Sequence, residues 1–219
     1  MFASRKVRTL AKVAAALAVV AVTGAVLSAA TDSPNRDSEA TLNGGELLPP
    51  EAFDDIADPA ERSAAIFTEA TKVFLHPRCS NCHPSEGDRP RQGDDGKLHE
   101  PHVRRGEDGF GVPALQCATC HTSVNFNPAG IPGAENWHLA PPEMGWRGKS
   151  ISDLCEQLKD PKSNGERTLE ELVDHVDHDP LVTWAWNPGA KRQPVPGTQD
   201  IFVALIAAWV EDGAVCPTP

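Results

Sequence analysis

The chain has no tyrosine, only two methionines and no excess of basic residues. Its 219 residues include 20 Lys and Arg against 31 Asp and Glu, which gives a formal net charge of −11. A nucleic-acid-binding protein needs a basic footprint, so the composition excludes that class. The acidic balance is compatible with plain solubility or with a partner that presents a basic patch.

Cysteine is also missing from the first part of the chain, because none precedes Cys79. A lipid-modified cysteine near the N-terminus is therefore excluded. Residues 1–30 instead resemble a cleaved signal peptide, with a basic start, an apolar run from Val13 to Leu27 and small residues at 28–30. An uncleaved membrane anchor is the alternative interpretation. Arg5 and Arg8 are not adjacent, which favours the general secretory route over the twin-arginine route. We expect a periplasmic protein with no membrane association after cleavage.

Long apolar runs are scarce beyond the signal peptide, whereas there are 20 prolines and 17 glycines. Such a chain needs a metal, a disulfide or a cofactor around which to build its core. Residues 31–56 are polar and contain Pro and Gly pairs, which is typical of a flexible linker. We therefore expect one folded domain over residues 57–219.

Helical signals predict a mainly α fold with few helices and much coil. Asp58 and Pro59 are a favourable N-cap and first position for a helix that continues to about residue 74. Further helices are expected over 150–159, from Thr168 with a capping box, and from Thr198 to Gly213. Residues 84–116 show almost no periodicity and predict a long functional loop. No convincing strand is found.

Two C-x-x-C-H motifs, CSNCH at 79–83 and CATCH at 117–121, are the strongest chemical signal. Four thiolates could bind zinc, but that site leaves both trailing histidines unexplained. A thioredoxin-like dithiol needs a βαβ context, which is absent. The third interpretation is attachment of c-type haem, in which two thiols bind the porphyrin and the histidine ligates iron. It uses all six residues: Cys79, Cys82, His83, Cys117, Cys120 and His121.

An export signal followed by two such motifs predicts two covalently bound haems, with His83 and His121 as proximal iron ligands. The motifs start only 38 residues apart, which is too short for two cytochrome domains in tandem. We therefore expect both haems in one coil-rich domain. The remaining cysteines, Cys155 and Cys216, predict a disulfide in an oxidising compartment, with Cys155 as a haem ligand as the alternative.

The distal ligands are restricted by counting methionines. Met1 leaves with the signal peptide, so Met144 alone could serve, and at most one haem can be His/Met. His175 continues the apolar stripe of its predicted helix, whereas His178 points towards water. His138 lies in an apolar setting, and spacing does not separate His99 from His102.

Several segments together resemble a family of short exported dihaem c-type cytochromes, often labelled as an isoquinoline 1-oxidoreductase subunit. The segments span roughly residues 70–217 and include HPRCSNCHP, RRGEDGFGVPALQCATCH, NWHLAPPEM, LCEQLKDPKSNG and LVDHVDHDPLVTWAWNPG. The resemblance implies distal ligands among His99, His138, His175 and Met144. It also implies a redox partner such as a molybdenum hydroxylase or another dehydrogenase.

The expected function is electron relay between a partner dehydrogenase and a downstream acceptor. The chain carries nothing similar to a molybdopterin or flavin site, so it would not itself oxidise isoquinoline. The alternative is a dihaem redox enzyme, of the peroxidase or thiosulfate dehydrogenase type, with one open or labile haem. A haem-based sensor is a third possibility, but no output module is apparent.

Overall fold

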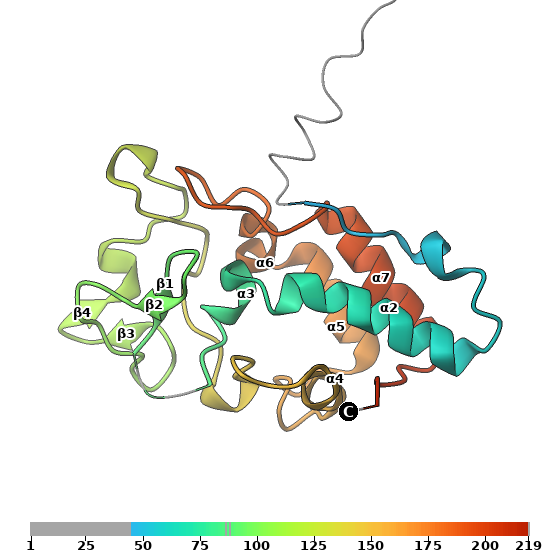
Figure 1. Cartoon of the computed structure of the whole chain (residues 1–219). Coiled ribbons are helices and arrows are strands. Elements are labelled where there is room, and N and C mark those ends of the chain that lie inside the picture. Colours follow the sequence, from blue (N-terminus) through green and yellow to red (C-terminus); the bar gives the residue numbers. More distant parts are fainter. Residues whose placement is uncertain (1–44, 86, 88, 219) are drawn as a thin grey trace, which may run out of the picture. The chain divides into compact units, whose positions relative to one another are not determined.

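The computed structural model describes residues 45–85, 87 and 89–218, and helices and coil dominate this part of the chain (Figure 1). The predicted signal peptide and residues 31–44 of the predicted linker lie outside the described residues. Among the described helices, none is long and apolar enough to span a membrane. The elements are η1 Pro50–Phe53, α2 Pro59–Phe74, α3 Pro77–Ser80, β1 Arg91–Gln92, β2 Lys97–Leu98, β3 Gly111–Val112, β4 Leu115–Gln116, η2 Cys117–Thr119, η3 Asn127–Ala129, η4 Pro142–Met144, α4 Ile151–Lys159, α5 Leu169–His178, α6 Pro180–Trp184 and α7 Gln199–Glu211.

The helical core forms where α2 packs against α7. Asp58 caps α2 by accepting hydrogen bonds from the backbone amides of Ala60 and Glu61, and Pro59 is the first helical residue, as the sequence predicted. The apolar face of α2 is buried, and Phe67 is fully enclosed against Trp209 of α7, with ring centroids 5.0 Å apart.

The capping box of α5 confirms a further sequence prediction, and α4 is the helix that was expected over 150–159. The Ser150 hydroxyl accepts a hydrogen bond from the amide of Asp153, and Thr168 forms a reciprocal capping box with Glu171. Asp179 then ends α5 in an extended conformation, and its carboxylate caps the short helix α6, which was not predicted from the sequence. Asp-Pro at 179–180 was its signal, but a five-residue helix is too short to show periodicity.

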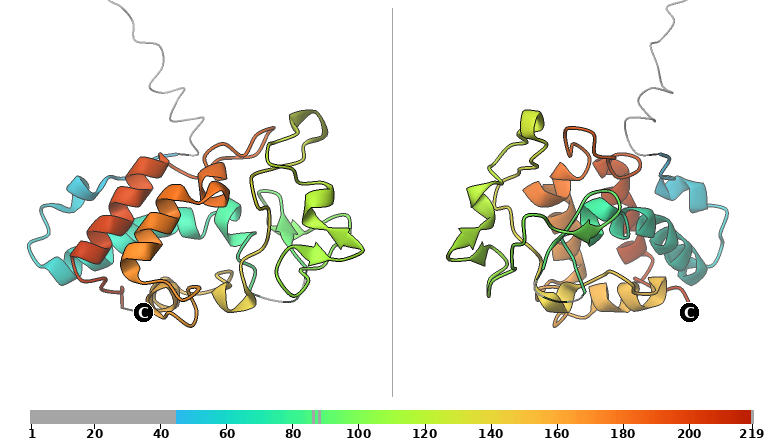
Figure 2. Two further views of the ribbon diagram at one scale, coloured as in Figure 1. Left: turned by 180° about the vertical axis from the view of Figure 1, so that it is seen from behind. Right: turned by 60° about the vertical axis from the view of Figure 1, so that its left-hand side comes forward.

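Two antiparallel hairpins correct the expectation that the chain has no strands. Strand β1 pairs with β2, and β3 pairs with β4, in two-residue ladders. They lie in the coil-rich region on one side of the helices (Figure 2). Ladders this short leave no alternating pattern of apolar residues, so periodicity could not reveal them.

The C-terminal part of the predicted linker, residues 31–56, belongs to the folded unit. Leu47 is buried in the helical core, and the amide of Leu48 donates a 2.8 Å hydrogen bond to the Glu69 carboxylate of α2. The amide of Gly197 likewise donates to the carbonyl of Gly45. Residues from 45 onwards therefore belong to the folded unit.

The C-terminal tail is tied to the helices by a disulfide between Cys155 of α4 and Cys216. This is the pairing expected from the cysteine count, and it engages the sulfur of Cys155. Hydrogen bonds hold the same tail, because the amide of Val215 donates to the Ser63 hydroxyl and the Trp209 indole donates to the Val215 carbonyl.

Candidate functional site

Both C-x-x-C-H motifs fold into the same backbone turn. In the first, the amides of Cys82 and His83 donate to the carbonyl of Cys79, at 3.0 and 3.1 Å. In the second, the amides of Cys120 and His121 donate to the carbonyl of Cys117, at 3.1 and 2.9 Å. In each motif, one turn thus places the two thiols and the imidazole close to one another.

The imidazole of His83 is fixed on two sides. Its Nδ1 lies 2.8 Å from the carbonyl oxygen of Met144, and its ring stacks on Trp146 with centroids 3.4 Å apart and an interplanar angle of 6°. A carbonyl can only accept, so Nδ1 carries the proton and Nε2 keeps its lone pair. This is the state in which histidine binds a metal.

The imidazole of His121 is held in the same way. Its Nδ1 lies 2.8 Å from the carbonyl oxygen of Pro132, and its ring stacks on Trp137 at a centroid distance of 4.7 Å and an angle of 7°. Neither tryptophan contact was predicted from the sequence. A usable signal was present, since each anchoring carbonyl residue is followed by glycine and then, within five residues, by tryptophan.

The two glycines after these carbonyls allow the chain to approach each motif closely. A Cβ at Gly145 would lie 2.5 Å from the Cα of Ser85, and one at Gly133 would lie 2.3 Å from the carbonyl oxygen of Val124. Any side chain there would displace the carbonyl that positions the histidine.

A cavity of about 300 Å³ lies beside the first motif. Its wall includes residues from α2, α5, α6 and α7, so it opens within the helical part of the molecule. The motif contributes Cys79, Cys82 and His83 to the wall, and His138, Met144 and His175 also line it. Three of the four predicted distal ligands therefore share this cavity.

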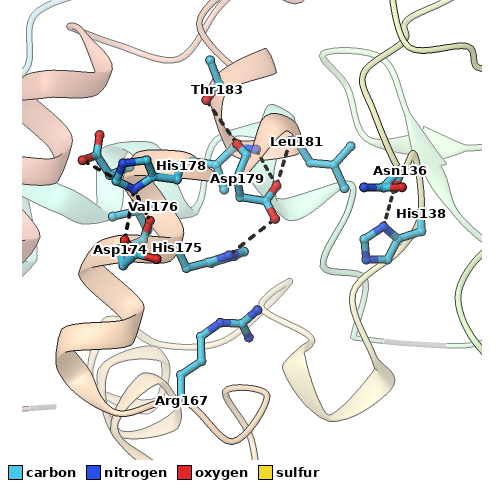
Figure 3. Close-up of polar contacts among 12 residues, drawn as sticks. Asn136, His138, Arg167, Asp174, His175, Val176, His178, Asp179, Leu181 and Thr183 are labelled. Carbon is cyan, nitrogen blue, oxygen red and sulfur yellow. Dashed lines mark hydrogen bonds and ion pairs between the residues drawn. The ribbon is translucent and has the colours of Figure 1, made fainter.

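His175 is half-buried, whereas His178, on the same helix, is exposed, as the helical pattern predicted. Figure 3 shows the His175 side chain extending towards Asp179, whose carboxylate lies 3.5 Å from Nδ1. The Asp179 carboxylate is held in turn by the amides of Leu181 and Val182. A carboxylate at Nδ1 favours the tautomer whose Nε2 lone pair is free for a metal.

A second cavity, of about 490 Å³, adjoins the CATCH motif. Cys117, Cys120 and His121 line it together with His99, and the hairpins and coil supply most of its remaining wall. The rings of His99 and His121 are arranged edge to face, with centroids 5.9 Å apart and an interplanar angle of 67°. His102 is exposed and does not line this cavity.

Burial keeps the histidine and the thiols of the first motif neutral. The pKa of His83 is lowered to about 3, mainly by desolvation and to a smaller extent by the nearby His175 and His138. Desolvation also raises the pKa of Cys79 to about 12 and that of Cys82 to about 11. Both sulfurs are therefore thiols at neutral pH.

The four motif cysteines are not brought into one cluster. Across the described residues, no three His, Cys, Asp or Glu side chains are grouped as a metal ion would require. The cysteines instead divide between the two cavities, with Cys82 on the wall of both.

The polar groups around the cavities fit the two carboxylates of a porphyrin. Five basic side chains and only one acidic side chain line the larger cavity, in a chain that is acidic overall. Among the described residues, the buried Nε atoms of Arg78 and Arg91 and the indole nitrogen of Trp146 have no hydrogen-bond partner. Unpartnered buried donors are costly, and anionic oxygens in the cavities would satisfy them. The basic residues of the larger cavity are Arg78, Arg91, Lys97, Arg104 and Arg192.

Comparisons with known protein families, with curated proteins and with solved structures found no match to this chain.

Proposed function

We propose that this chain is a periplasmic dihaem c-type cytochrome that relays electrons between a partner dehydrogenase and a downstream acceptor. The observation that carries the proposal is the duplicated arrangement of two thiols and one fixed, neutral imidazole at the wall of a cavity. Cys79 and Cys82 would hold one haem covalently, and Cys117 and Cys120 would hold the other. His83 and His121 would be the proximal ligands.

For the haem at His121, the proposed distal ligand is His99. Both imidazoles line the same cavity with ring centroids 5.9 Å apart, which supports a role for both of them in holding one iron. The Nδ1 of His99 lies 3.1 Å from the carbonyl oxygen of Pro101, which leaves Nε2 for the metal.

For the haem at His83, the proposed distal ligand is His175, which lines the same cavity with Asp179 at its Nδ1. Met144 is the weaker candidate for a geometric reason. Its carbonyl binds the Nδ1 of His83, so its backbone lies on the side of that imidazole away from the metal. His138 stacks on Phe110 at 4.7 Å and is assigned to the cavity wall.

Bound haem would supply an iron that exchanges one electron between the ferric and ferrous states. The chain fixes the imidazoles of His83 and His121 through Nδ1 and through ring stacking, and with His175 and His99 it would offer two imidazoles to each iron. Irons held in that way would have no position left for a substrate, which favours relay over catalysis. We further propose, from the family resemblance, a molybdenum hydroxylase or another dehydrogenase as the electron donor.

Haem stoichiometry tests the central proposal. The exported protein, made in a host with cytochrome c maturation, should contain two covalent haems per chain by pyridine haemochrome assay and intact mass. Replacing Cys79 and Cys82 by alanine should remove one haem, and replacing Cys117 and Cys120 should remove the other. Fewer than two covalent haems in the wild-type protein would refute the proposal.

Carbon monoxide binding separates the relay from the dihaem enzyme of the peroxidase or thiosulfate dehydrogenase type. The reduced wild-type protein should bind carbon monoxide slowly or not at all. The variant His99→Ala should bind it rapidly at one haem, whereas His102→Ala should behave as the wild-type protein. Rapid binding by the wild-type protein would favour the enzyme.

A further inference from the structure

Asn125, in the loop that follows the CATCH motif, is half-buried and makes three hydrogen bonds with its side chain. Its Oδ1 accepts from the amide of Gly133 at 3.1 Å and from the indole of Trp184 at 2.9 Å. Its Nδ2 donates to the carbonyl of Asn187 at 2.9 Å. Because two donors meet Oδ1 and an acceptor meets Nδ2, these neighbours fix the orientation of the side-chain amide.

The first of these bonds acts on the group that anchors His121. The Gly133 amide and the Pro132 carbonyl belong to one peptide unit, and that carbonyl oxygen lies 2.8 Å from Nδ1 of His121. Asn125, this peptide unit and His121 therefore form one chain of hydrogen bonds. Each bond in such a chain polarises the next, so an acceptor at the amide makes the carbonyl a stronger acceptor for His121.

The second bond acts on the aromatic rings behind His121. Trp137 stacks on His121, and Trp184 meets Trp137 edge to face, with ring centroids 5.0 Å apart and an interplanar angle of 89°. Trp184 is buried, and Asn125 holds its indole nitrogen. One side chain thus supports both groups that fix the imidazole of His121.

The first motif is anchored differently. The peptide unit of Met144 and Gly145 fixes His83, and its amide donates to the backbone carbonyl of Pro142 at 3.1 Å. A backbone acceptor there takes the place that the Asn125 side chain has in the second motif. A substitution at Asn125 should therefore act on the site at His121 and leave the site at His83 as an internal reference.

We propose that Asn125 is a positioning residue for the iron ligand His121, and that it lowers the reduction potential of the haem bound there. This inference rests on the proposed function. A stronger hydrogen bond from Nδ1 makes the imidazole a more basic ligand. Greater negative charge at the ligand stabilises ferric iron over ferrous iron. Loss of the acceptor at Asn125 should therefore raise the potential.

The test is a redox titration of the proposed two-haem protein, followed by visible absorption and by low-temperature EPR of the separate ferric signals. Asn125→Leu should shift the ferric–ferrous equilibrium at His121 about threefold towards ferrous, a rise of about 28 mV. Asn125→Asp keeps an oxygen acceptor and adds negative charge, so it should lower the same potential. Both variants lose the bond to Asn187, so the difference between them reports the acceptor and not the attachment of the loop.

Asn127 offers a matched control in the same loop. Its Oδ1 accepts from the amide of Ala190 at 2.8 Å, so it ties the loop to the segment after α6 from outside the hydrogen-bond chain of His121. Asn127→Leu should leave both potentials unchanged, and Asn127→Asp should lower the potential at His121 less than Asn125→Asp does. An equal fall in the two aspartate variants would show that charge alone is responsible and would overturn the inference.

An unchanged or lowered potential at His121 in Asn125→Leu, with both haems retained, would also overturn the inference while leaving the proposed function intact. Asn125→Asp covers the case in which Asn125→Leu does not accumulate, because it preserves the shape of the side chain and both accepted bonds. An unchanged or raised potential in Asn125→Asp would overturn the inference as well. A wild-type protein with fewer than two haems would instead refute the proposed function, so the two failures are distinct.

Discussion

Removal of the disulfide between Cys155 and Cys216 should destabilise the protein strongly without disturbing its proposed haem sites. The two residues are 61 positions apart in the sequence. In the chain-entropy description, opening a loop of that length costs about 4 kcal/mol of unfolding free energy. That is a large fraction of the roughly 5–15 kcal/mol typical of a folded domain.

The native geometry should survive the loss, because the tail keeps its other contacts. The Val215 amide still has the Ser63 hydroxyl, and the Trp209 indole still has the Val215 carbonyl. Helix α4 also stays attached to the site through Gln157, whose side chain donates to the carbonyl of Glu143 at 2.7 Å. The effect should therefore arise mainly in the unfolded chain.

The assay is urea unfolding of the proposed two-haem protein with Cys155→Ala and Cys216→Ala, followed by far-ultraviolet circular dichroism. With a slope near 2 kcal/mol/M, the midpoint should fall by about 2 M. A reductant strong enough to open the disulfide should lower the wild-type midpoint similarly and leave the variant unchanged. A loss below about 1 kcal/mol, or an altered haem spectrum in the folded variant, would refute the reasoning.

Three further predictions concern the site. His175→Ala should make one ferric haem high-spin by EPR and leave the other unchanged. The control His178→Ala, at an exposed residue of the same helix, should change neither haem. Two unchanged haems in His175→Ala would rule out His175 as a ligand. Gly145→Val should reduce haem occupancy at the first motif, measured by haemochrome assay, because its Cβ would overlap Ser85, and full occupancy would contradict that contact. Since burial lowers the pKa of His83 to about 3 from an ordinary value near 6.5, the unfolded chain binds more protons between these values. The stability of the haem-free chain should therefore fall as the pH drops from about 6.5 to 3, and a flat profile in urea titrations over this window would contradict the burial of that imidazole.

Local chemistry made much of the fold predictable. The helix caps at Asp58, Ser150 and Thr168 contact residues only two or three positions away. Because both partners are close in the sequence, a local sequence pattern can predict such contacts. The disulfide was predictable for a different reason, since counting left only Cys155 and Cys216. These features required no knowledge of how distant segments meet.

The parts of the site that escaped prediction depend on distant segments. Arg78 meets Asp94 across a loop, and His83 meets the carbonyl of Met144 from 61 positions away. Neither contact has a spacing that periodicity could reveal. Spacing likewise left the choice between His99 and His102 open. The structure separates them, because His102 is exposed whereas His99 lines the larger cavity beside His121.

The uneven distribution of the apolar core has a consequence for how the cell could control the amount of this protein. Among the described residues between 85 and 148, the buried apolar side chains are Ala134, Leu139, Met144 and Trp146. Of these, only Trp146 belongs to the main helical core. In the proposed holoprotein, this region would obtain most of its buried apolar surface from porphyrin. A shortage of haem would then leave the region open to proteases, so that cofactor supply itself would set the abundance of the protein.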